Sequence, residues 1–107
     1  MAKIKSITNQ EIVFDDESTI SFGHPHPYYE DNYADFSQLD DIGKITDFDT
    51  CNMVFEAVPY SGFRFGNVNK MFFIPCYSEQ SDYYTDVIDI YYNDKRVLCF
   101  DCEEILH

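Results

Sequence analysis

The chain has 107 residues and a formal net charge of −13, because 20 aspartates and glutamates face seven lysines and arginines. A protein that binds nucleic acid directly needs clustered basic residues to neutralise phosphates; the few basic residues here are spread out, which argues against nucleic acid and anionic membranes as direct partners. No apolar run approaches the roughly 20 residues that span a bilayer, and no secretory signal is visible, so we expect one cytoplasmic domain over residues 1–107.

The first predicted element is a hairpin near the amino terminus. Ile12 and Phe14 occupy alternate positions of one short segment, and Ile20 and Phe22 do so in the next. The acidic stretch Asp15–Ser18 lies between the two segments and supplies turn residues. This pattern predicts two antiparallel strands that bury one face.

The segment HPHPYYEDNYADF follows at residues 24–36. Pro25 and Pro27 restrict the chain to extended or turn conformations, so no helix can begin at the histidines. Asp31 is a suitable N-cap, and the neighbouring carboxylates favour a helix start.

An apolar stripe at spacings of three comes next, formed by Tyr33, Phe36 and Leu39. It predicts one short amphipathic helix near residues 31–39, which can pack on a sheet. Gly43 follows as a stop signal.

Further strands are predicted in the middle of the chain, separated by Pro59, Gly62 and Gly66-Asn67. They lie near Lys44–Asp49, Asn52–Val58, Phe63–Phe65 and Lys70–Cys76.

A second hairpin is predicted near the carboxyl terminus, where Ile88 and Ile90 alternate along one strand. A two-residue turn at Asn93-Asp94 would place Val97 opposite Ile90, whereas a three-residue loop would place Leu98 there. A slip of one residue turns every side chain to the opposite face of a strand. We therefore predict the three-residue loop, which keeps the apolar side chains of both strands together.

Sequential strands joined by short turns predict an α+β fold that is mainly antiparallel β, arranged as a meander or a small sandwich with one short helix. The side chains expected to face its core are those of Ile12, Phe14, Ile20, Phe22, Phe72, Ile74, Ile88, Ile90, Leu98 and Phe100.

Four cysteines, Cys51, Cys76, Cys99 and Cys102, are expected to be free and mostly buried, because nothing indicates an oxidising compartment. Cys99 and Cys102 have the C-x-x-C spacing of many zinc sites. Residues three apart in a strand face opposite sides, however, which would keep these two sulfurs from sharing a metal. We expect no cofactor.

Two alternatives remain open for the histidines. His24 and His26 could bind a metal together with Glu30 and Asp31, although the proline between the histidines favours an exposed turn. A catalytic alternative pairs the thiol of Cys76 with one of the two histidines. No phosphate-binding loop, nucleophile elbow or zinc-protease motif is present, so we expect a protein that is not an enzyme.

The same segment resembles a family of small uncharacterised phage and bacterial proteins with the pattern His-x-x-Asp-Cys-Cys-Glu-x-x-Tyr-Ala-Asp, followed later by a Tyr-Tyr segment. The matching residues are His24, Glu30, Tyr33, Ala34, Asp35 and Tyr83-Tyr84. Pro27, Tyr28 and Tyr29 replace the family's Asp-Cys-Cys, so any redox or metal role of that cysteine pair is lost here. The resemblance implies a phage or prophage setting in a bacterial host cell and no established activity.

These observations favour a small acidic binding protein whose partner is a protein with a basic surface. Carboxylates on a β scaffold could occupy a basic nucleic-acid groove, so the sharpest hypothesis is a phage-type inhibitor that mimics nucleic acid and acts against a host nuclease or defence complex. The alternative is an acidic accessory domain whose charge serves solubility. The residues predicted to bind are Tyr28, Tyr29, Glu30, Asp31, Asp35, Tyr83 and Tyr84.

The nucleic-acid mimic hypothesis predicts where the acidic residues lie in the fold. Three acidic groups should lie on one continuous face, whereas scattered positions would favour the alternative. The groups are Asp15-Asp16-Glu17, Glu30-Asp31-Asp35 and Asp40-Asp41.

Overall fold

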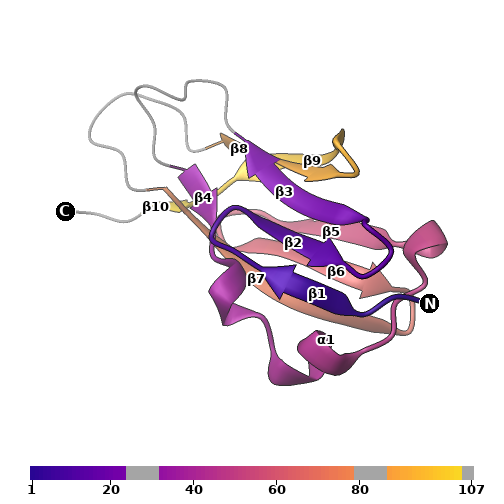
Figure 1. Ribbon diagram of the computed structural model, residues 1–107. Coiled ribbons are helices and arrows are strands. Elements are labelled where there is room, and N and C mark those ends of the chain that lie inside the picture. Colours follow the sequence, from indigo (N-terminus) through magenta and orange to yellow (C-terminus); the bar gives the residue numbers. More distant parts are fainter. Residues whose placement is uncertain (24–31, 79–86, 105–107) are drawn as a thin grey trace.

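The computed structural model describes residues 1–23, 32–78 and 87–104, which form two sheets packed as a sandwich (Figure 1). Within this part of the chain the first sheet has five strands, in the order β1-β2-β3-β8-β9, and each neighbouring pair is antiparallel. Its strands are β1 (Ile4–Ile7), β2 (Glu11–Phe14), β3 (Thr19–Gly23), β8 (Val87–Tyr92) and β9 (Lys95–Asp101).

The second sheet has the order β10-β7-β6-β5, and β4 also pairs with β7. Its pairings are antiparallel except that β10 runs parallel to β7. The fold is therefore mostly antiparallel β in its sandwich form, as the sequence predicted. The strands are β4 (Asn32–Ala34), β5 (Val54–Val58), β6 (Gly62–Asn67), β7 (Lys70–Ser78) and β10 (Glu103–Glu104).

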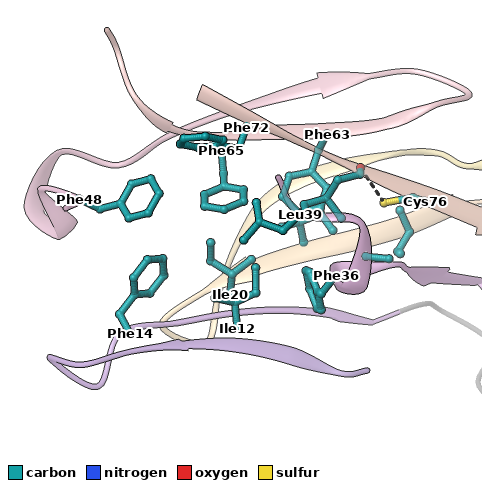
Figure 2. Packing of buried hydrophobic residues seen from close by; sticks show 14 of the residues in the cluster. Ile12, Phe14, Ile20, Phe36, Leu39, Phe48, Phe63, Phe65, Phe72 and Cys76 are labelled. Atoms are coloured by element: carbon teal, nitrogen blue, oxygen red, sulfur yellow. Dashed lines mark hydrogen bonds between the residues drawn. The ribbon is translucent and has the colours of Figure 1, made fainter. Parts of the chain in front are cut away.

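An aromatic core lies between the sheets (Figure 2). Phe48 contacts rings of both sheets: its ring centroid lies 5.5 Å from that of Phe14 and 5.7 Å from those of Phe65 and Phe72. These separations are typical of favourable aromatic pairs. All the side chains predicted to face the core are buried, apart from Phe22 and Leu98, which are partly buried and pack against it. The predicted core is thus confirmed.

The hairpin of β8 and β9 has the predicted strand register but a different turn. Its paired residues are Ile88 with Phe100, Ile90 with Leu98, Tyr91 with Arg96 and Tyr92 with Lys95. The connection is the tight two-residue turn, with φ of 51° at Asn93 and 67° at Asp94. A β-bulge leaves Val97 without a partner residue in this pairing. The bulge adds the residue that the three-residue loop was expected to add.

The predicted helix near residues 31–39 is wrong in position. Asn32–Ala34 is a strand whose burial alternates with period two, and the 3₁₀ turn η1 (Phe36–Gln38) follows it. Backbone pairing with β7 at all three strand positions outweighs a weak local helix preference. Phe36 and Leu39 still reach the core, because η1 turns their side chains towards it.

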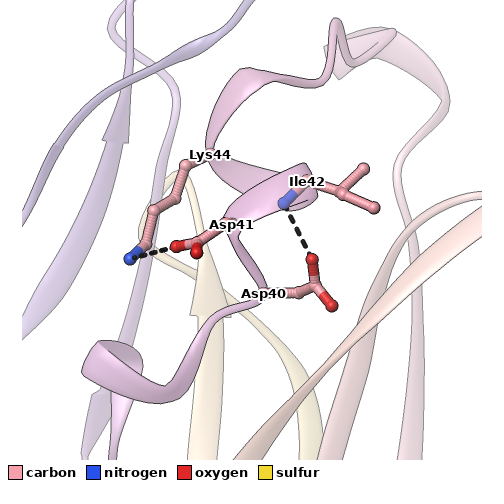
Figure 3. A network of polar contacts seen from close by, with 4 residues as sticks. All are labelled: Asp40, Asp41, Ile42 and Lys44. Carbon is pink, nitrogen blue, oxygen red and sulfur yellow. Dashed lines mark hydrogen bonds and ion pairs between the residues drawn. The ribbon is translucent and has the colours of Figure 1, made fainter.

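The α-helix in the described residues begins later, as α1 (Asp41–Ile45) (Figure 3). Asp40 caps it by accepting a 2.7 Å hydrogen bond from the backbone nitrogen of Ile42, and the Lys44 ammonium lies 3.3 Å from the Asp41 carboxylate. No helix in the described ranges has the length and apolarity to cross a membrane.

Gly43 does not stop this helix but lies buried inside it. A Cβ atom there would lie 3.0 Å from a methyl carbon of Leu39 and 3.1 Å from the Phe72 ring, so glycine permits close packing on the sheet. The strand predicted over Lys44–Asp49 is also absent: α1 takes up its start, and Phe48 forms an isolated bridge with Ala2. The 3₁₀ turn η2 (Thr50–Asn52) comes before β5.

All four cysteines are thiols that form no disulfide. Cys76 and Cys102 are buried, whereas Cys51 and Cys99 are exposed, so the expectation that most are buried holds for two of the four. Cys99 is exposed and Cys102 is buried, as expected if residues three apart face opposite sides.

Candidate functional site

Of the residues predicted to bind, Asp35 lies in the described part of the chain. The others lie outside it, namely Tyr28, Tyr29, Glu30 and Asp31 in residues 24–31, and Tyr83 and Tyr84 in residues 79–86. His24 and His26, the histidines of the metal and catalytic alternatives, also lie outside it. The described residues that flank these two segments therefore locate the candidate site.

The flanking residues of both segments meet at one end of the sandwich. Residues 24–31 connect β3 to β4, and residues 79–86 connect β7 to β8. Asn32 pairs with Ser78 between β4 and β7, and β3 pairs with β8 at its last residue, Gly23. We call the group Gly23, Asn32, Ser78 and Val87 the Asn32 junction. Segments more than 40 positions apart in the sequence thus leave and re-enter the fold side by side.

Asn32 holds this junction together through its side-chain amide. Its Oδ1 accepts a 2.6 Å hydrogen bond from Ser78 Oγ, and its Nδ2 donates a 2.9 Å bond to the carbonyl oxygen of Val87. Asn32 and Ser78 are the buried polar residues of the described chain, with exposed fractions of 1% and 0%. The amide thus links the residue that follows residues 24–31 to the two described residues that flank residues 79–86.

Asp35 lies just beyond β4 and caps η1. Its Oδ1 accepts hydrogen bonds from the backbone nitrogen of Ser37, at 3.2 Å, and from the Ser37 hydroxyl. Its backbone nitrogen donates to the carbonyl oxygen of Pro75 on β7, at 2.9 Å. The carboxylate is thus fixed, and within the described residues its Oδ2 has no hydrogen bond.

A cavity of about 360 Å³ opens beside Asp35, at the Ile7 end of β1. Another cavity, of about 420 Å³, lies near Met1, at the other end of β1. The walls of the cavity beside Asp35 are partly apolar and partly polar: Ile7, Thr8, Asn9, Tyr33, Ala34, Asp35 and Ser37. Tyr33 also packs against Tyr77 of β7, with ring centroids 5.8 Å apart and the rings tilted. An aromatic ring beside a fixed carboxylate suits a cationic side chain, which gains from both.

Asp89 is a second carboxylate close to the junction, paired with Gly23 across β3 and with Cys99 across β9. Its side chain is only 15% exposed, and the nearest cation is Arg96 at 3.9 Å. Its Oδ1 has no hydrogen-bond partner among the described residues. The hydrogen bond from Cys99 to Asp89 raises the pKa of the Cys99 thiol above its ordinary value.

These thiols do not have the features of an activated nucleophile. A catalytic cysteine has a lowered pKa, whereas burial, with a smaller contribution from Cys102, raises the pKa of Cys76 far above its usual range. The described residues also contain no group of three or more histidine, cysteine or acidic side chains arranged to hold a metal. Both histidines of the metal alternative lie outside these residues.

The other acidic groups lie elsewhere. Asp15, Asp16 and Glu17 form the turn between β2 and β3, at the opposite end of β3 from the junction, and Asp40-Asp41 begin α1. Asp16 is tied to η2, because its Oδ2 accepts a 2.5 Å hydrogen bond from the Thr50 hydroxyl.

Sequence reasoning missed Asn32, Ser78 and Asp89. Asn32 was assigned to the polar start of a helix, and Ser78 ends an apolar strand without any motif around it. Asp89 did carry a signal, since it interrupts the apolar run Val87–Tyr92, but alternation places such a residue outside by default.

Comparison of the chain with protein-family models, with curated proteins and with solved structures finds no match.

Proposed function

We propose that this chain is a small acidic binding protein without enzymatic activity, and that its partner is a protein with a basic surface. The observation that supports this proposal is the Asn32 junction, which brings together the bases of the two segments that carry Tyr28, Tyr29, Tyr83 and Tyr84. Aromatic residues beside carboxylates are suited to an interface, because tyrosines supply desolvated contacts and carboxylates supply steering.

The finer form of the proposal is a phage-type inhibitor that occupies a basic cleft in place of nucleic acid. A net charge of −13 on 107 residues supports it, because a basic groove that releases counterions to phosphate also releases them to carboxylates. In this form Glu30, Asp31 and Asp35 face the cleft, and the rest of the acidic surface steers approach from a distance.

A second candidate is an acidic accessory domain, and one observation favours it. Asp16, Asp35, Asp40 and Asp49 each accept a hydrogen bond from the backbone nitrogen two residues later. Such aspartates stabilise turns and helix starts locally. Part of the acidity therefore has a structural use that needs no partner. Asp15–Glu17 lie in the turn before β3 whereas Asp35 follows β4, which fits scattered charge.

The test begins with capture of partners from lysate of a bacterial host by the immobilised chain, followed by binding kinetics with each purified partner. If a basic cleft is the target, association should slow steeply with added salt, because charges are screened beyond about 8 Å at physiological ionic strength. Nucleic acid should compete for the partner. A partner whose binding neither weakens with salt nor yields to nucleic acid would contradict the mimic.

Variants locate the binding surface. The triple change Glu30→Gln, Asp31→Asn and Asp35→Asn should slow association, while Tyr28→Ala or Tyr84→Ala should speed dissociation. Asparagine still caps a turn, so the change at Asp35 removes charge and keeps η1.

Asp40→Asn is the matched control, because it makes the same change at another exposed cap. Equal effects of Asp40→Asn and Asp35→Asn would show that only net charge matters and would favour the accessory domain.

A further inference from the structure

Two of the four thiols lie at neighbouring positions of the second sheet: Cys76 is in β7, and Cys102 directly precedes β10. In the parallel pairing of β10 with β7, Glu103 lies opposite Tyr77 and Glu104 opposite Ser78. Because the two strands are parallel, the preceding residue of each, Cys102 and Cys76, should also lie opposite each other. Neighbouring strands run about 4.8 Å apart, which falls within the roughly 4.4–6.8 Å that separates the Cα atoms of disulfide-bonded cysteines.

Both side chains also point the same way. Cys76 and Cys102 are each 0% exposed and belong to the same core cluster, and opposed residues of a parallel pair share one face of the sheet. Figure 2 shows the Cys76 sulfur at the edge of that cluster, 4.0 Å from the carbonyl oxygen of Ile74. Each thiolate would repel the other, as the contribution of Cys102 to the raised pKa of Cys76 indicates. The pairing of β10 with β7 and the burial of both side chains in one core cluster therefore bring the two thiols together.

We propose that Cys76 and Cys102 form a disulfide when the protein meets a low-molecular-weight disulfide such as oxidised glutathione, and that this bond fastens the chain between β9 and β10 to β7. The thiolate of Cys102 first attacks oxidised glutathione and releases one glutathione thiol. The thiolate of Cys76 then attacks the Cys102 sulfur of the mixed disulfide and releases the second. The two cysteines lose two protons and two electrons, and oxidised glutathione is reduced to two thiols.

The order of attack follows from the strands. β7 pairs with β6 along most of its length and with β4 beyond it, whereas β10 has two residues and, among the described strands, pairs with β7 alone. Short, weakly paired segments open more often than central strands, so Cys102 is the thiol that reaches the oxidant. Closure of β10 then returns it to Cys76.

The spacing in the sequence indicates a different pair, and the structure argues against that pair. Cys99 and Cys102 are three residues apart, but Cys99 is exposed and Cys102 is buried on the other side of the chain. Cys51 lies in η2 and is also exposed. Cys51 and Cys99 should therefore take up glutathione singly, whereas the buried pair should lose it to form the internal bond.

The test uses the full chain with Cys51→Ser and Cys99→Ser, so that Cys76 and Cys102 are the remaining thiols. The reduced protein is incubated with oxidised glutathione, and its intact mass, its cross-linked peptides after digestion and its melting temperature are measured. We expect a mass lower by two hydrogen atoms, a peptide that joins Cys76 to Cys102, and a melting temperature higher by roughly 10 °C, because the bond closes a loop in the unfolded chain.

Cys102→Ser in the same background is the control, and it should give at most one glutathione adduct and no cross-link. Two stable glutathione adducts on the pair would overturn the proposal. If the native protein stays reduced, the same oxidation is run in urea, followed by refolding. A cross-linked chain that refolds with a higher melting temperature supports the proposal, and one that refolds with a lower melting temperature, or not at all, overturns it.

Discussion

Ser78 and Asn32, 46 positions apart in the sequence, are joined by a 2.6 Å hydrogen bond in the core, and Asn32 passes the connection on to the Val87 carbonyl. We predict that Asn32→Ala lowers the free energy of unfolding by roughly 2–4 kcal/mol, because it leaves a buried hydroxyl and a carbonyl without their partner. Urea denaturation measures the loss. Asn9→Ala, at an exposed position in the turn before β2, should cost almost nothing.

A double-mutant cycle separates the hydrogen bond from other effects of Asn32. Ser78→Ala alone should also destabilise, but the double variant should lose less than the sum of the two single changes. Strictly additive losses would show that the two side chains act independently and that the junction is held by other contacts.

The tight turn of the β8–β9 hairpin contains a non-glycine residue at φ 67°, Asp94. Glycine adopts this conformation without strain and is the residue that such turns prefer. Asp94→Gly should therefore raise the free energy of unfolding by roughly 0.5–1 kcal/mol, measured by urea denaturation. Asp94→Ala removes the same charge and keeps a Cβ atom, so it should give no gain. Equal gains from both variants would assign the effect to charge.

Gly66 of β6 has φ 147°, and a Cβ atom there would lie 2.3 Å from the backbone oxygen of Lys70. Because backbone of a paired strand cannot move aside, Gly66→Ala should lower the free energy of unfolding by about 3 kcal/mol or more. Gly23→Ala is the comparison, since its nearest contact is the movable ring of Tyr91 at 3.2 Å. A mild effect at Gly66 would mean that β6 and β7 can separate there.

The Thr50 hydroxyl and the backbone nitrogen of Ser18 hold the pKa of Asp16 below its ordinary value of 3.8. A carboxylate with a lowered folded pKa stabilises the fold above its unfolded pKa, and this contribution disappears as the pH falls through the folded value. Thr50→Val should therefore be less stable than the parent near neutral pH, with the difference shrinking below about pH 4. Urea midpoints measured against pH test this.

Thr46→Val is the control for that series. The Thr46 hydroxyl donates to the carbonyl oxygen of Ile42 at 2.6 Å, with no carboxylate involved. Its loss should therefore cost the same at every pH. A loss at Thr50 that is likewise independent of pH would show that Asp16 draws no stability from the bond.

The hairpin of β8 and β9 shows what the alternation of apolar residues predicts correctly and what it does not. The apolar faces required Ile90 to lie opposite Leu98, and they do. The prediction then assigned the extra residue to the loop, although Asn93-Asp94 suits a tight turn. A bulge inside β9 allows both the pairing of Ile90 with Leu98 and the tight turn at Asn93-Asp94. Sequence alternation alone does not distinguish a residue added in a loop from one added in a strand.

The region after residue 31 shows where local patterns fail. Tyr33, Phe36 and Leu39 have helical spacing, but β7 offers Asn32–Ala34 a strand to pair with, and that partner comes more than 40 residues later. The same distance hid the candidate site, because the link between Asn32 and Ser78 depends on which strands pair. Asp35 was found because its local motif is visible within a few residues.

The pairing of β3 with β8 bears on how the chain folds. Thr19 at the start of β3 donates its backbone N–H to the Asn93 side chain, 74 positions further along. Within the described residues, the pairing of β3 with β8 is what connects β1-β2-β3 to β8-β9 in the first sheet. The β2–β3 and β8–β9 hairpins can each form early. Pairing β3 with β8, however, closes a very long loop, and the entropy lost in closing it is offset only after the contacts between the strands have formed. On a translating ribosome β3 must therefore wait, with its edge unpaired, until β8 has been synthesised, and the slow step of folding is the meeting of the two halves.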